Sequence, residues 1–203
     1  MWTNKKTEKK LLEIAQKQGG YFTSGQALKA GYSYRLQSYH KEQKHWKEID
    51  TGLYKLTNLP ASEYDDLIRW SLWSRDNKGN PQAVISHESA LVVHELGDVL
   101  PVKVHLIIPV KFRKEIPDGV IYHKGNIKPE DIEMRDDFSI TTPIRTIIDV
   151  AEGNISMEQL EQVVRDGLDK GLIRPVQFQK AQMSIKVRSK ISTVLANIKK
   201  NPF

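Results

Sequence analysis

The spacing of apolar and polar residues near the N-terminus predicts three short helices. In residues 7–17, leucine, isoleucine and alanine return at helical spacing with lysines opposite, and Gly19–Gly20 follow as a stop signal. Ser24 can cap a second helix that ends near Gly31. Ser33 can cap a third.

A β-hairpin is predicted directly after these helices. Residues 46–49 and 53–56 alternate in polarity on either side of a turn that contains Gly52. Three helices followed by a hairpin are the elements of a winged helix. Helix pairs with short turns also occur as plain packing units, so a structural or protein-binding role stays open at this point.

The remainder of the chain predicts a mixed α/β domain with helices at its end. A break at residues 58–62 indicates a junction. Apolar periodicity, capping residues and β-branched runs then predict helices at 63–73 and 87–95, strands at 102–109, 119–123, 132–134 and 138–140, and helices at 142–150, 157–170, 175–182 and 184–200. We therefore expect an α+β fold, with a winged helix-turn-helix domain in residues 1–60 and a second domain in 61–203.

The third helix carries the candidate DNA-binding residues. A rotation of about 100° per residue places Leu36, Tyr39, His40 and Gln43 on its inner side. Its outer face and the hairpin beside it would then meet base edges and phosphates. The expected DNA-binding set is Thr23, Ser33, Tyr34, Arg35, Gln37, Ser38, Lys41, Lys44 and Lys47.

The distribution of charge favours the same conclusion. The chain has 203 residues and a net charge of +6. Residues 1–60 have 11 basic and 5 acidic residues, 11 − 5 = +6, and residues 61–203 balance at 20 − 20 = 0. A basic module on a neutral body is typical of a nucleic-acid binder, although a solvated lysine-rich surface would show the same count.

Within the second domain, residues 61–173 carry 13 − 20 = −7 and residues 174–203 carry 7 − 0 = +7. The last helix also has an apolar stripe, so it could pack on the acidic middle, touch nucleic acid or lie on a membrane. With 0 cysteines, disulfides and thiolate sites are excluded. The charged N-terminus is unlike a signal peptide and no apolar run approaches a membrane span, so we expect a cytoplasmic protein without a membrane partner.

The sequence gives little indication of catalysis. His87–Glu88 and His94–Glu95 suggest a zinc motif, but histidines seven positions apart lie about 10 Å apart along a helix, too far for one ion. The position of His105 inside a predicted strand indicates a structural role for this residue. There is no glycine-rich phosphate loop and no GxSxG elbow. We expect no catalytic, cofactor or metal site, and the scattered carboxylates leave a metal-dependent nuclease formally open.

Three runs resemble the AbiEi antitoxin family: SHESALVVHELGDVLPVKVHLIIP at 86–109, GVIYHKGNIKPEDI at 119–132 and TTPIRTIIDVA at 141–151. The predicted winged helix, ending in TGLYKL at 51–56, occupies the position of that family's own. The similarity spans roughly residues 8–175.

The resemblance implies a bacterial antitoxin of a type IV toxin–antitoxin system. Such an antitoxin opposes a nucleotidyltransferase toxin without forming a stable complex, acts in abortive phage infection and represses its own operon by binding inverted repeats in double-stranded DNA. The C-terminal domain is implied to carry antitoxicity. The alternatives are a nuclease-like or nucleotide-processing enzyme targeted by a winged helix, and a stand-alone transcriptional regulator.

Overall fold

The computed structural model describes residues 4–135 and 137–200, which form an α+β fold with two sheets. The contacts divide the chain into two compact units. The first unit contains Met1–Ala83 with Met134–Phe138, and the second contains Val84–Glu133 with Ser139–Phe203. The expected α+β class is confirmed.

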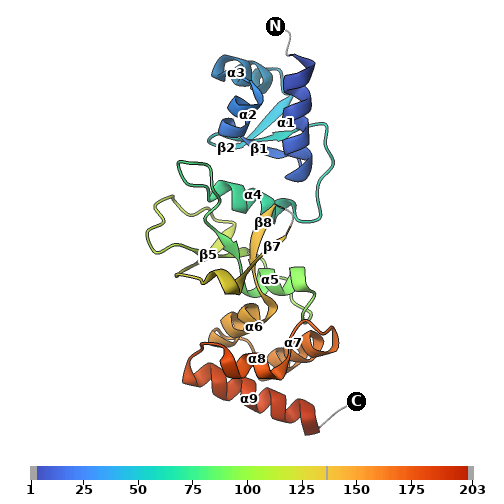
Figure 1. Cartoon of the computed structure of the whole chain (residues 1–203), viewed down its shortest axis with the longest axis vertical. Helices are drawn as coiled ribbons and strands as arrows, with labels where there is room; N and C mark the ends of the chain where they lie inside the picture. The colour runs from blue at the N-terminus through green and yellow to red at the C-terminus, as the bar shows by residue number, and fades with distance from the viewer. Residues whose placement is uncertain (1–3, 136, 201–203) are drawn as a thin grey trace. The chain divides into compact units, whose positions relative to one another are not determined.

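The first unit begins with three helices and a three-stranded antiparallel sheet (Figure 1). The sheet has the order β1-β3-β2, and its core contains Leu11, Phe22 and Trp46. The Phe22 and Trp46 rings meet edge to face, with centroids 4.7 Å apart. The elements are α1 (Lys5–Lys17), β1 (Tyr21–Thr23), α2 (Ser24–Ala30), α3 (Tyr34–Glu42), β2 (Trp46–Asp50) and β3 (Leu53–Leu56).

A fourth helix, α4 (Asp65–Trp73), belongs to the same unit. Its Asp65 carboxylate forms an ion pair with Lys55 and accepts a hydrogen bond of 2.9 Å from the Tyr21 hydroxyl. Arg75 donates to the Thr51 carbonyl at 2.8 Å. Because these bonds join α4 and the chain after it to the small sheet, the structural division follows Ala83, whereas we expected the boundary near residue 60.

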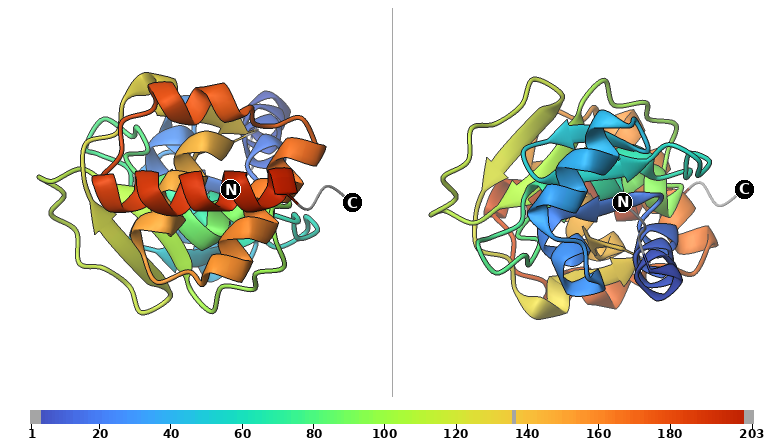
Figure 2. Two further views of the ribbon diagram at one scale, coloured as in Figure 1. Left: turned by 90° about the horizontal axis from the view of Figure 1, so that it is seen from below. Right: turned by 90° about the horizontal axis from the view of Figure 1, so that it is seen from above.

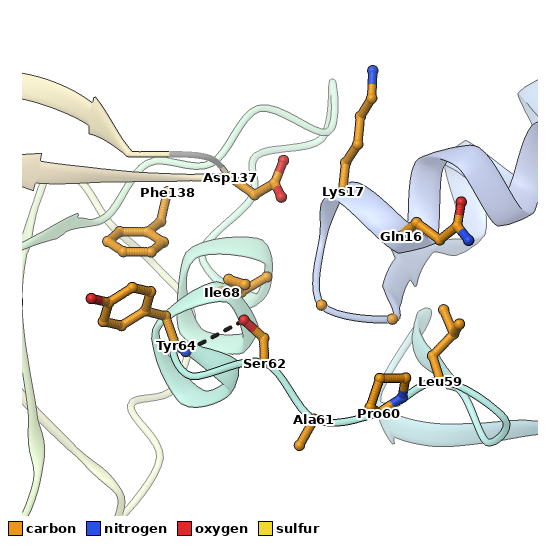
Figure 3. Close-up of a pocket in the computed structure, with 12 residues that line it drawn as sticks. Gln16, Lys17, Leu59, Pro60, Ala61, Ser62, Tyr64, Ile68, Asp137 and Phe138 are labelled. Atoms are coloured by element: carbon orange, nitrogen blue, oxygen red, sulfur yellow. Dashed lines mark hydrogen bonds between the residues drawn. The ribbon is translucent and has the colours of Figure 1, made fainter.

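The predicted junction at residues 58–62 runs along a hollow of about 680 Å³ (Figure 3). The end of α1 and Phe138 also line this hollow. The Tyr64 and Phe138 rings pack edge to face at a centroid distance of 5.7 Å, and the Tyr64 amide donates to the Ser62 hydroxyl at 3.4 Å. The junction is therefore largely exposed along the hollow, and the chain becomes packed again at Tyr64.

The second sheet has the order β6-β5-β4-β8-β7. β5 pairs with β4 in antiparallel and with β6 in parallel orientation. α5 (His87–His94) follows β4 and packs on β5. The strands are β4 (Val84–Ile85), β5 (Val104–Ile108), β6 (Val120–Lys124), β7 (Ile132–Arg135) and β8 (Phe138–Thr141), and a short 3-10 turn, η1 (Pro129–Asp131), precedes β7.

Four further helices complete the second unit: α6 (Pro143–Glu152), α7 (Met157–Asp169), α8 (Pro175–Lys180) and α9 (Ile185–Lys200). α9 lies across α6 and α7 (Figure 2). Its Val187, Ile191 and Val194 are buried in the helical core, so of the three alternatives for its apolar stripe the structure shows internal packing. None of the helices in residues 4–135 and 137–200 combines the length and apolarity needed to cross a bilayer.

Candidate nucleic-acid interface

Contacts on the inner side of α3 determine which side of this helix faces solvent. The Ser33 hydroxyl caps it by accepting from the Leu36 amide at 3.3 Å, as expected from the sequence. On the inner side, the His40 ring stacks on Trp46 with centroids 5.0 Å apart. Burial lowers the pKa of His40, which favours a neutral ring against the core. The opposite side of α3 must therefore face solvent.

Seven of the nine expected DNA-binding residues are exposed: four on α3, Ser33 at its N-cap, and Lys44 and Lys47 just before and on β2. We call this set the α3 surface. Tyr34 is 69% exposed. Lys41 forms an ion pair with Glu48 at 3.1 Å, in which both side chains keep about two fifths of their surface exposed. The members of the α3 surface are Ser33, Tyr34, Arg35, Ser38, Lys41, Lys44 and Lys47.

Gln37 was expected on this surface, and that placement is wrong. Its side chain is 3% exposed and forms three hydrogen bonds. The buried face of α3 includes Gln37, which the sequence placed outside, because α2 packs against that side of the helix. This packing brings Ser24 and the Tyr32 carbonyl within hydrogen-bonding reach of the Gln37 amide. Gln43, expected inside, is exposed beyond the end of the helix.

Thr23 is a second correction, because it is 6% exposed and lies at the start of α2. Its hydroxyl accepts a hydrogen bond from the Gln26 amide at 3.2 Å, while the Gln26 side chain accepts from the Thr23 amide at 2.8 Å. This capping box satisfies two free amides of the helix end. We therefore assign Thr23 to the architecture of α2 and leave it out of the α3 surface.

The structure also brings together three histidines that the sequence treats as unrelated. His87, His105 and His123 each offer one ring nitrogen, and these nitrogens all lie within 4.8 Å of one another. Burial lowers the pKa of each ring, that of His87 to about 3, so the rings are neutral at pH 7. We call these residues the histidine cluster.

Sequence reasoning compared His87 with His94, its neighbour on the same helix. His94 is buried elsewhere, with Nε2 at 2.8 Å from the Thr141 carbonyl oxygen. The nearby Asp149 belongs to an ion-pair network with Arg145, at 2.8 Å, and Asp131. Burial raises the pKa of Asp149 to about 6 in spite of the Arg145 guanidinium. The Arg145 charge also contributes to lowering the pKa of His87, so this network lies close enough to act on the histidine cluster.

These observations define the chain as a mixed α+β protein with two sheets and an exposed basic helix in its first unit. No protein-family model and no curated protein matches it. Among solved structures, it is similar to the RV2827C protein from Mycobacterium tuberculosis, with 14% sequence identity and a TM-score of 0.49. That alignment covers 96% of this chain and 78% of the mycobacterial chain.

Proposed function

We propose that residues 5–56 form a winged helix that binds double-stranded DNA through the α3 surface, and that the protein is an antitoxin that represses its own operon. The observation that carries the DNA-binding proposal is the two-sided character of α3. Its inner side is anchored on Trp46 and on the Gln37 hydrogen bonds, and its outer side exposes cationic, hydroxyl and aromatic groups.

The chemistry of the α3 surface suits a major groove, which is wide enough to admit one α-helix. Tyr34, Arg35 and Ser38 occupy the first part of α3, the part from which recognition helices contact bases. Arg35 has the planar donor group that pairs with guanine O6 and N7. Lys44 and Lys47 are exposed just before and on β2, where they would contact phosphates while the β2–β3 hairpin serves as the wing.

The test is an anisotropy titration of the full chain with a duplex from the region upstream of its own gene. Affinity should fall steeply with salt, with a slope of about −0.9 in log K against log salt for each neutralised phosphate. Arg35→Ala should weaken binding by about 1–3 kcal/mol, and Lys47→Ala should reduce the salt slope by about 1.

The matched control is Lys186→Ala, which removes one exposed lysine from α9 in the other unit. It should bind like the wild type. If Arg35→Ala and Lys47→Ala both bind like the wild type, the α3 surface is not the interface. If Lys186→Ala lost as much DNA affinity as Lys47→Ala, the binding would depend on the overall positive charge of the protein and not on the α3 surface.

The antitoxin part of the proposal is supported by the resemblance of residues 86–109, 119–132 and 141–151 to the AbiEi family. All three runs lie within the second unit, apart from the α3 surface. The proposed partners are inverted repeats in the operon's own promoter and a nucleotidyltransferase toxin that is opposed without a stable complex.

This arrangement predicts separable activities in a co-expression assay with a nucleotidyltransferase toxin, sought among the genes that neighbour its own. The wild-type chain should restore growth and also repress a promoter reporter. Arg35→Ala should restore growth but repress poorly, because only DNA binding requires the α3 surface. Toxicity that persists with the wild-type chain would refute the antitoxin proposal and leave a stand-alone regulator.

A further inference from the structure

The histidine cluster is assembled from three elements of the second unit. His87 begins α5, His105 lies on β5 and His123 lies on β6. Because Ile107 is paired with His123 across the parallel strands, His105 and His123 project from the same face of the sheet. Each of the three residues keeps part of its surface exposed, so an ion from solvent can reach the rings.

One distance within the cluster matches that between two ligands of one metal ion. His105 Nδ1 lies 3.2 Å from His123 Nε2 and 3.1 Å from Glu88 Oε2. Two ligands at 2.0–2.1 Å from a tetrahedral Zn²⁺ are separated by about 3.3 Å. The edge between His105 and His123 is therefore present before any ion is added, and Glu88 lies beside one end of it.

Two further contacts fit a metal site. The His87 Nδ1 atom lies 2.9 Å from the Ser86 hydroxyl oxygen, which orients the ring and leaves Nε2 for an ion. Glu88 Oε2 is buried, and among the described residues no group donates a hydrogen bond of normal geometry to it. Buried carboxylate oxygens normally have a donor or a cation beside them. This oxygen lies 3.1 Å from His105 Nδ1, on the side of the histidine cluster.

We propose that His87, His105 and His123 bind one divalent transition-metal ion, Zn²⁺ being the best fit, and that Glu88, beside His105, turns toward the ion as the fourth ligand. Three imidazoles and one carboxylate suit Zn²⁺, whereas Mg²⁺ and Ca²⁺ prefer oxygen ligands. Arg145 is the nearby cation that acts on His87, and its charge is offset by its pairs with Asp149 and Asp131. The site would revise the sequence-based expectation of no metal.

The competing explanation is a metal-free cluster stabilised by ring contacts. His87 and His123 stack with centroids 3.6 Å apart and planes 10° from parallel. Parallel rings do not aim their nitrogens at one point, so at least one ring must turn when the ion binds. The two explanations thus differ in a measurable way, because only the metal site gives stoichiometric, saturable binding.

The experiment uses the untagged full-length chain, treated with a chelator and then titrated with Zn²⁺ against a chromophoric competitor. We expect one ion per chain with a Kd below about 1 µM, and a rise in Tm on Zn²⁺ addition. Co²⁺ in the same site should show the intense visible bands of tetrahedral coordination. Glu88→Gln should weaken binding by about 10–100-fold.

Two histidine variants and one control complete the design. His105→Ala removes a mostly buried ring, and His123→Gln alters a position on the edge strand β6, where folding is more tolerant. Both should abolish stoichiometric Zn²⁺ binding and the Tm rise. His45→Gln, in the other unit, removes an exposed histidine that contacts His40 at 3.2 Å and should leave both unchanged.

Failure of the wild-type chain to bind Zn²⁺, or binding of several weak ions per chain, would overturn the proposal. Wild-type affinity in a folded His123→Gln variant would do the same. Because the histidine cluster and the α3 surface belong to different units, these outcomes are independent of DNA binding.

Discussion

The reassignment of Gln37 from the proposed DNA-binding surface to the core leads to a quantitative prediction for Gln37→Ala. The Gln37 amide donates to the carbonyls of Tyr32 and Ser24 at 3.2 and 3.3 Å, and its oxygen accepts from the Ser24 hydroxyl at 2.7 Å. A neutral hydrogen bond contributes a net ~0.5–1.5 kcal/mol, so three contribute roughly 1.5–4.5 kcal/mol. We expect the first unit to lose about 3 kcal/mol of unfolding free energy.

Urea unfolding followed by tryptophan fluorescence measures this loss in the relevant unit. Trp46, Trp70 and Trp73 lie in the described part of the first unit, and the remaining tryptophan, Trp2, also precedes residue 84. With an m-value of about 2 kcal/mol per M, a loss of 3 kcal/mol lowers the midpoint by about 1.5 M urea.

Gln43→Ala is the matched control, because Gln43 is an exposed amide at the end of the same helix. It should stay within about 0.5 kcal/mol of the wild type. If Gln37→Ala unfolded at the wild-type urea concentration and lost DNA binding instead, the Gln37 amide would be a groove contact and its structural assignment would be refuted.

Two further predictions concern the second unit. Asp149→Asn tests the pKa of about 6 that burial gives Asp149, raised from 3.8. The raised pKa stabilises the folded state while Asp149 is protonated, so the wild type should lose up to about 3 kcal/mol of unfolding free energy as the pH rises from about 4 to about 7. The variant has no such carboxyl group and should not show this loss. Parallel pH profiles of the two proteins in denaturant unfolding would contradict the prediction. Gly97→Ala should destabilise the protein by about 2–4 kcal/mol, because Gly97 has a φ of 68° and an added Cβ would lie 2.8 Å from Val163 Cγ2. A circular-dichroism melt measures this loss. An unchanged Tm would show that Val163 can move away.

Local structure in this chain follows closely from local sequence. The helix beginning at Thr142–Pro143 forms as expected, with the Thr142 hydroxyl accepting from the Arg145 amide at 3.4 Å. The hairpin around Gly52 also forms, and Gly52 has a positive φ of 64°. Gly97, which by sequence would end the helix at 87–95, does not do so: α5 ends in a left-handed Glu95, and Gly97 instead lies close to Val163. Such signals act over a few residues, and a sequence therefore displays them directly.

By itself the sequence determined the order and type of the elements, the basic character of the N-terminal helices and the apolar stripe of the last helix. Only the tertiary structure decided that Gln37 faces α2, that α4 joins the first unit and that His123 lies beside His105. The physical reason is the range of the interactions. Caps and periodicity act within one or two helical turns, whereas the orientation of α3 and the pairing of β5 with β6 depend on packing between segments distant in the chain.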